Sequence, residues 1–129
     1  MIFQLKENGM RADLSYGELD ISGNEDYGYR PFQLMVASIA GCSASVFQKI
    51  LEKQRTEIVD LQVHAEVERN PEEANRIEKI LLKYVIKGRR LDPDKLYKNM
   101  EVARRNCSMI RSVENSITIE EQIDTVELS

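Results

Sequence analysis

The stretch that decides the fold runs from Arg30 to Leu51 and reads RPFQLMVASIAGCSASVFQKIL. Proline fixes its own φ and lacks an N–H, so it suits the first turn of a helix and predicts that one opens at Pro31. From Leu34 to Phe47 there is no charged residue, and the apolar residues do not keep to one face. Because a helix that is apolar nearly all round is a buried helix, we expect this one at the centre of the core.

The middle of this predicted helix is rich in small residues. Gly41 in a helix interior costs about 1 kcal/mol relative to alanine, so we expect another segment to approach closely there. The second half gains Gln48, Lys49, Glu52 and Lys53. A membrane span needs about 20 uninterrupted apolar residues, so the sequence predicts no membrane span.

Composition limits the classes of protein that the chain can belong to. With 129 residues, 42% of them hydrophobic and 31% charged, the chain is long enough for one domain with a real core. A net charge of −4 argues against nucleic acid as a partner, since its binders need a basic face. The N-terminus has no apolar leader, which predicts a cytoplasmic, reducing location. Two cysteines and one histidine without a CxxC motif predict no zinc site.

The residues before the helix predict short strands. Alternation over 2–5 and 10–14, around the turn signal Asn8-Gly9, favours a hairpin. Leu19 and Ile21 predict a third strand. A polar loop over 22–28 then leads to the start of the helix, where it could line a site.

The residues after the helix predict a long hairpin with one polar face in water. Apolar residues from Ile58 to Val67 and from Ile77 to Ile86 mark its strands, with an interruption near Leu81 and a turn over 70–75. His64 lies on the polar face and reads as a surface residue. A short helix over 71–82 is the alternative.

Asp92-Pro93 is the clearest helix start in the chain, an N-cap followed by a proline. Helical spacing then predicts one apolar face made of Leu96, Met100, Ala103, Cys107 and Ile110. Residues 117–123 predict a last strand, followed by a frayed tail over 124–129. Together, these predicted elements form a single α+β domain over 1–129. Since such a small domain would struggle to cover a helix that is apolar on all sides, we expect a homodimer that shares it.

The residues around both cysteines and the order of elements resemble the OsmC/Ohr family (osmotically inducible protein C and organic hydroperoxide resistance protein). The first motif is Pro31-Phe32-Gln33-Leu34-Met35-Val36-Ala37-Ser38-Ile39-Ala40-Gly41-Cys42-Ser43, and the second is Asn106-Cys107-Ser108-Met109-Ile110. The resemblance covers nearly the whole chain. It implies an intertwined homodimer with two active sites at the subunit interface, and a peroxidase that reduces organic hydroperoxides to alcohols.

The resemblance also implies roles for the cysteines. Cys42 would be the peroxidatic thiolate that becomes a sulfenic acid, and Cys107 the resolving thiol that closes a disulfide. A cellular dithiol would then reduce the disulfide, and no metal or organic cofactor is implied. In the family an arginine holds the thiolate, and Arg11 and Arg30 are both candidates for it.

Two positions depart from the family pattern. An acidic residue that follows the proline holds the arginine in the family, whereas Gln33 stands in this region here and supplies no charge. Ser108 stands where a proline usually follows the second cysteine. A loop carboxylate could replace the missing one, and the candidates are Glu18, Asp20, Glu25 and Asp26.

Other interpretations of the same residues remain open. Each cysteine alone reads as a small core residue. Tyr27, Tyr29 and Phe32 could wall an apolar pocket or pack between subunits. The fold could therefore serve a protein that binds a small lipophilic ligand without turnover, or a redox sensor in which a slow Cys42–Cys107 disulfide changes a partner contact.

Overall fold

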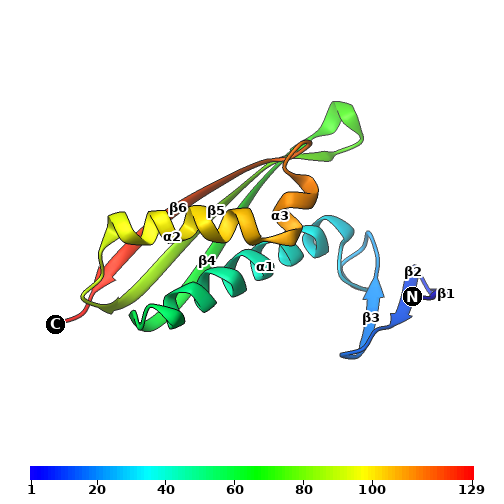
Figure 1. Cartoon of the computed structure of the whole chain (residues 1–129). Helices are drawn as coiled ribbons and strands as arrows, with labels where there is room; N and C mark the ends of the chain where they lie inside the picture. The colour runs from blue at the N-terminus through cyan, green and yellow to red at the C-terminus, as the bar shows by residue number, and fades with distance from the viewer. The chain divides into compact units, whose positions relative to one another are not determined.

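A computed structural model describes residues 1–129 and divides them into two compact parts, 1–37 and 38–129 (Figure 1). The α+β class and the predicted order of elements are confirmed, with N-terminal strands, a central helix, a long hairpin, a second helix and a final strand. The two parts are described in turn.

The first part holds an antiparallel sheet of β1 (Phe3–Lys6), β2 (Gly9–Asp13) and β3 (Glu18–Ile21). The predicted hairpin is confirmed, but its turn lies one residue earlier than Asn8-Gly9, because Gly9 already pairs with Lys6. Asn8, the second of the two turn residues, has a left-handed backbone with φ of 57°. A Cβ on Gly9 would collide with the carbonyl oxygen of Ile21, so glycine is needed for β3 to lie alongside β2.

This small sheet buries little of its own apolar surface. Ala12 and Ser22 are buried, whereas Ile2 is 76% and Leu5 87% exposed. The loop after β3 turns back on the sheet, where the Tyr29 N–H donates to the Asp20 carbonyl oxygen at 2.9 Å. The first part is therefore ordered by backbone hydrogen bonds more than by a core.

Helix α1 (Pro31–Lys53) begins at the predicted proline. The prediction that the chain buries this helix is wrong, since only 28% of its most apolar 18-residue window is buried. No atom lies within 4 Å of a Cβ built on Gly41, so the close approach expected there is absent within one chain. By length and composition alone α1 is apolar enough to cross a membrane, and the prediction against a span rests on its polar second half.

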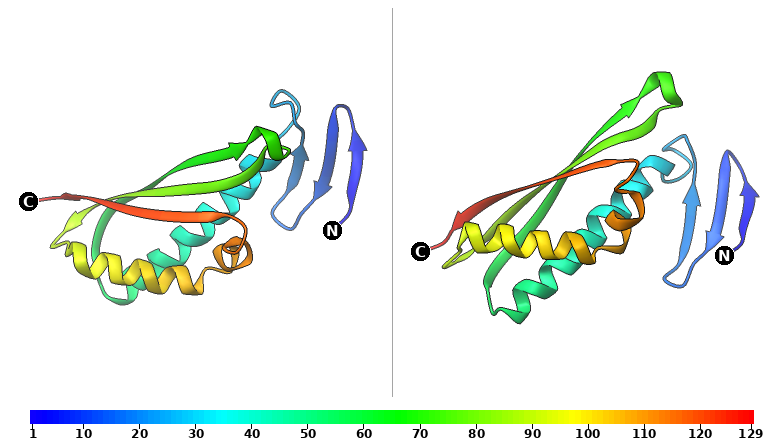
Figure 2. Two further views of the ribbon diagram at one scale, coloured as in Figure 1. Left: turned by 90° about the horizontal axis from the view of Figure 1, so that it is seen from above. Right: turned by 45° about the horizontal axis from the view of Figure 1, so that its top comes forward.

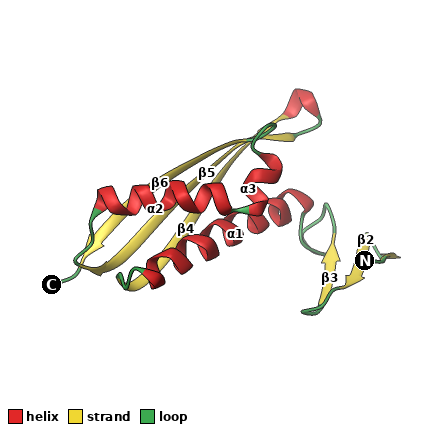
Figure 3. Ribbon diagram, viewed as in Figure 1, coloured by secondary structure: helices red, strands yellow, loops and turns green.

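The second part is built on a sheet of order β4-β5-β6 (Figure 3). Strands β4 (Glu57–Asn70) and β5 (Arg76–Arg89) form the predicted hairpin. The tight connection η1 (Pro71–Glu73) is a single 3-10 turn, and the alternative of a helix over 71–82 is wrong. The pairing is irregular between Ile77 and Lys79, not near Leu81, and this explains the three-residue step from Ile77 to Ile80.

Helices α2 (Pro93–Asn106) and α3 (Ser108–Val113) replace the one continuous helix that the apolar spacing predicted. The break falls at Cys107, whose backbone is extended, with φ of −87° and ψ of 107°. Its sulfur caps α3 by accepting a hydrogen bond from the Ile110 N–H at 3.5 Å. The residues on either side of Cys107 keep the apolar spacing of one continuous helix, but the helix is interrupted at Cys107, whose sulfur caps α3.

Strand β6 (Thr118–Glu127) is longer than predicted. It runs parallel to β5 and pairs with it as far as Gly88, and the Leu128 N–H donates to the Gly88 carbonyl oxygen at 2.8 Å. The predicted frayed tail over 124–129 is therefore wrong for 124–127, because the pairing with β5 satisfies that backbone.

Helices α1 and α2 lie side by side over one face of this sheet (Figures 1 and 2). Phe47 of α1 is fully buried and meets Tyr84 of β5 edge to face, with ring centroids 5.4 Å apart. Further buried core residues of this part include Ile39, Leu51, Ile80, Leu82, Ile86, Leu96, Met100 and Ala103. Burying such side chains contributes about 1.5–3 kcal/mol each, which fixes the two helices on the sheet.

Candidate functional site

The two cysteines, 65 residues apart in the sequence (107 − 42), meet in the second part. Cys42 comes from α1, and Cys107 comes from the break between α2 and α3. Both are free thiols; Cys42 is partly exposed and Cys107 fully buried. The Cys107 thiol is close enough to donate a hydrogen bond to the Cys42 sulfur. A molecule in solvent can therefore reach the Cys42 sulfur, whereas the Cys107 sulfur is buried next to Cys42.

Hydrogen-bond donors at the N-terminal end of α3 point at the Cys42 sulfur. The Met109 backbone N–H donates to its sulfur and is the strongest cause that lowers the pKa of Cys42. The Cys107 thiol and both the hydroxyl and the N–H of Ser108 add to this, with the Ser108 Oγ 3.8 Å from the sulfur. Burial opposes them, and the pKa still falls below its ordinary value. Cys42 has the environment of a reactive thiolate.

Cys107 has the opposite environment. Burial raises the pKa of its thiol, and the adjacent Cys42 sulfur raises it further. Cys107 therefore keeps its proton while Cys42 is the anion, which suits the direction of the hydrogen bond between them. The pair combines a nucleophile and a protonated neighbour that can react after it.

A buried polar network starts at Ser43, the residue that follows Cys42. The Ser43 hydroxyl is hydrogen-bonded to the Tyr84 hydroxyl and donates to Glu121 Oε2 at 3.2 Å. Arg104 Nη1 lies 3.5 Å from Glu121 Oε1 and donates to the Ile119 carbonyl oxygen at 2.8 Å. Tyr84 is fully buried and the Glu121 side chain only 6% exposed. This network brings a carboxylate and a cation into the second part, beside the residue that follows Cys42.

The other predicted site residues belong to the first part. Arg11 is held by Asp20 through two hydrogen bonds, from Nε at 2.6 Å and from Nη2 at 3.1 Å. Arg30 lies over the ring of Phe32, 4.8 Å from its centroid. Gln33 lines a cavity of about 420 Å³ with Asp20, Glu25, Asp26, Tyr27, Gly28 and Tyr29. Among the carboxylates considered as a replacement, Asp20 is the one with both oxygens on Arg11.

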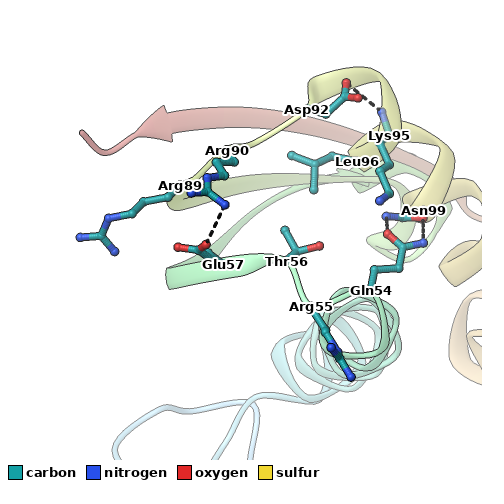
Figure 4. Close-up of a pocket in the computed structure, with 10 residues that line it drawn as sticks. All are labelled: Gln54, Arg55, Thr56, Glu57, Arg89, Arg90, Asp92, Lys95, Leu96 and Asn99. Atoms are coloured by element: carbon teal, nitrogen blue, oxygen red, sulfur yellow. Dashed lines mark hydrogen bonds and ion pairs between the residues drawn. The ribbon is translucent and has the colours of Figure 1, made fainter.

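A second cavity, of about 190 Å³, lies at the other end of α1 (Figure 4). Gln54, which directly follows α1, and Asn99 of α2 are joined by two reciprocal amide hydrogen bonds, of 2.9 and 2.7 Å. Glu57 lies 4.0 Å from Arg90, and the Arg89 side chain extends away from the cavity (Figure 4). Two of the polar pairs here, Gln54 with Asn99 and Glu57 with Arg90, are closed on themselves instead of converging on a common point, so the chemistry is better sought at the thiol pair.

Sequence reasoning found the two cysteines but missed their surroundings. In the sequence, Ser108 stands out only as a departure from a proline, although its N–H and hydroxyl both act on Cys42. In the sequence, Tyr84 reads as one more apolar position of the strand that runs from Ile77 to Ile86. A tyrosine in the middle of a buried face needs a partner for its hydroxyl, and that signal could have pointed to the serine next to Cys42.

This fold and site define an α+β protein with a partly exposed thiol and a buried one at a junction between helices. Among known families, the sequence model described as OsmC-like protein matches residues 23–122. The chain belongs to the OsmC-like protein family, as the resemblance at both cysteine motifs indicated.

Relatives and structural neighbours agree with this assignment. Protein YhfA of Escherichia coli K12 is 27% identical over 108 residues, which cover 82% of this chain and 81% of that protein. A hypothetical protein from Aquifex aeolicus VF5 has a TM-score of 0.88 at 22% identity, over 99% of this chain and 96% of its own. An organic hydroperoxide resistance protein from Elizabethkingia anophelis has a TM-score of 0.77 at 14% identity, over 97% and 94%. Similarity to these two structures shows the fold alone.

Proposed function

We propose that this protein is a thiol peroxidase that reduces organic hydroperoxides at Cys42, with Cys107 as the resolving thiol. The observation that carries the proposal is the asymmetry of the pair. Backbone N–H groups at the start of α3 lower the pKa of Cys42, while burial raises the pKa of Cys107. A partly exposed thiolate next to a protonated thiol is the arrangement that this reaction needs.

The reaction has two steps on the protein. The Cys42 thiolate attacks the terminal oxygen of the hydroperoxide, the O–O bond breaks, and the alkoxide that leaves takes up a proton to become the alcohol. Cys42 is then a sulfenic acid. The Cys107 sulfur attacks it, the S–O bond breaks, and water and a disulfide form. The two thiols together lose two electrons to the peroxide, and an external dithiol of the cell returns them.

The family resemblance makes Arg11 a candidate cation for the developing charge. Its guanidinium is fixed in orientation by Asp20, which supplies the carboxylate that Gln33 lacks. Ser108 also gives Cys42 an N–H donor that a proline at this position would not have. These two features support turnover despite both departures from the family pattern, and Arg30, which lies over Phe32, is the alternative cation.

A homodimer is part of the proposal. The face of α1 around Gly41 is open, and the first part leaves Ile2 and Leu5 exposed. Apolar surface of this kind calls for a partner, and the family resemblance favours a second copy. Sedimentation equilibrium should give twice the chain mass of 14.9 kDa. Gly41→Leu should shift the protein toward monomer, whereas Gly23→Leu, at another glycine with open space, should not. A monomeric wild type would contradict the dimer.

The test of the reaction is to mix reduced protein with one equivalent of an alkyl hydroperoxide. Loss of both thiols within seconds, with loss of two hydrogen masses by intact mass spectrometry, is the expected result. Cys42→Ser should abolish the reaction, and Cys107→Ser should stop it at a sulfenic acid that a dimedone probe traps. Intact thiols after many minutes would refute the peroxidase and favour the binding of a small lipophilic ligand.

A further inference from the structure

The sulfurs of both cysteines accept hydrogen bonds from the first turn of the short helix α3. Cys107 is the N-cap of α3, and its sulfur accepts from the Ile110 N–H at 3.5 Å. The Cys42 sulfur accepts from the N–H groups of Ser108 and Met109. The first three N–H groups of α3, which have no partner within a helix, therefore all donate to one sulfur or the other.

Few other contacts hold α3 in place. It has six residues, of which Ile110 is the buried one. Arg111 donates to the Arg105 carbonyl oxygen at 3.4 Å, but its side chain is largely exposed. Isolated helices shorter than about 12–15 residues are marginal in water, so α3 is not stable by itself. Buried residues fix the chain on either side, Ala103 in α2 and Ile117 after α3. The order of α3 between them depends on the two sulfurs.

We propose that Cys107, besides resolving the sulfenic acid, is a positioning residue that holds the N–H groups of α3 on Cys42, and that the Cys42–Cys107 disulfide releases α3. The inference rests on the proposed function, because it assigns a consequence to the disulfide that forms in that reaction. It makes α3 a segment whose order depends on the oxidation state of the pair.

Disulfide formation weakens the acceptors on which the first turn of α3 depends. In the reduced pair Cys42 is a thiolate, and a hydrogen bond to a charged acceptor is about twice as strong as one to a neutral acceptor. Once the two sulfurs are bonded neither carries a charge, and a neutral sulfur is a weak acceptor. The three N–H groups then bind water better than sulfur, which favours opening of the turn.

Release of α3 gives the external dithiol access to the disulfide. Cys107 is fully buried in the reduced protein, and α3 follows it directly in the chain. When the first turn opens, a dithiol can reach both sulfurs instead of Cys42 alone. The dithiol becomes a disulfide, the Cys42–Cys107 bond breaks, and the pair regains two electrons and two protons. The Cys42 thiolate then orders α3 again.

Amide hydrogen exchange in residues 108–113, followed by peptide mass spectrometry, tests the release. The disulfide is formed with diamide, an azo compound that takes two electrons and two protons from a thiol pair, so the test does not depend on peroxide. Oxidation should speed exchange in this segment about tenfold. The first turn of α2 is the matched control, because its N-cap Asp92 accepts from the N–H groups of Asp94 and Lys95 through oxygen, and its exchange should not change. Equal exchange in 108–113 before and after oxidation would overturn the proposal.

Two variants of Cys107 test the cap without a disulfide. Cys107→Ser keeps an acceptor of the kind preferred at an N-cap, whereas Cys107→Ala has none. Cys107→Ala should speed exchange in 108–113 without oxidant and raise the pH midpoint of Cys42 alkylation by about one pH unit, since the donors are no longer held at that sulfur. Cys107→Ser should return both toward wild type, and diamide should leave its α3 unchanged.

The two readouts together identify how Cys107 acts. An unaltered midpoint in Cys107→Ala would overturn the positioning role. A raised midpoint without faster exchange in 108–113 would also overturn it, because Cys107 would then act on Cys42 only through its own S–H.

The choice of oxidant separates this inference from the peroxidase. If a hydroperoxide leaves both thiols intact but diamide releases α3, the peroxidase fails and the release stands. If a hydroperoxide oxidises the pair and α3 keeps its slow exchange, the peroxidase stands and the release fails. If neither oxidant links the two sulfurs, both fail.

Discussion

Replacing Ser108 with proline tests whether the start of α3 stabilises the Cys42 thiolate. The change removes the N–H and the hydroxyl that both lower the pKa of Cys42. The backbone should accept it, since Ser108 is the first residue of α3, where proline fits, and Cys107 already has the extended conformation that a residue before proline prefers.

The magnitude follows from the hydrogen bonds that are lost. A hydrogen bond to a charged group contributes about 1.5–3 kcal/mol, and the low end applies because the Ser108 N–H is a weaker influence than that of Met109. Since 1.4 kcal/mol corresponds to a factor of about ten, Ser108→Pro should lower the ratio of thiolate to thiol at Cys42 about tenfold. Ser108→Ala removes only the hydroxyl, 3.8 Å from the sulfur, and should lower it about twofold.

The assay is the rate of Cys42 alkylation by iodoacetamide between pH 5 and about pH 10, followed by peptide mass spectrometry. The three proteins should differ most at low pH and converge at high pH, where the thiolate is fully formed in each. Unfolding by urea should show that the proline variant is folded. Equal rates and equal pH midpoints for wild type and Ser108→Pro would refute the stabilisation by α3.

Three other predictions concern the packing and the ion pairs of the fold. Phe47→Ala should destabilise the chain by about 3–5 kcal/mol in urea unfolding, because Phe47 is fully buried against an aromatic ring of β5, and a loss below about 1 kcal/mol would contradict that packing. The Asp20 carboxyl should titrate near pH 2 by NMR, because Arg11 lowers its pKa from 3.8 to about 2. Any stability that this pair adds is therefore present above pH 3.8 and lost as the pH falls through 2. Arg11→Ala should return the midpoint of the Asp20 titration toward 3.8. Gly9→Ala should increase amide exchange in β2 and β3, whereas Gly17→Ala, which has no neighbour within 4 Å, should not.

Much of the fold could be predicted from local signals. Pro31 marked the start of the central helix, and Asp92-Pro93 marked the start of α2. Alternation located the strands of both sheets because side chains of a strand point in turn to either face. The break at Cys107 could not be predicted in this way, since Ile110 and the residues before Cys107 keep one apolar spacing across it. That break depends on a sulfur that caps a helix.

Some features of the candidate site can likewise be predicted from local sequence, and others cannot. Local sequence patterns are enough to show that Cys42 lies among small residues on an apolar helix and that Cys107 follows an amphipathic one. Only the tertiary structure brought the two sulfurs together and gave them opposite pKa shifts, because those shifts come from groups distant in the sequence. The same holds for Glu121, which lies 78 residues from Ser43 and reads in the sequence as a strand acid like Glu120. A residue's type is local, but its burial and its hydrogen-bond partners are properties of the folded chain.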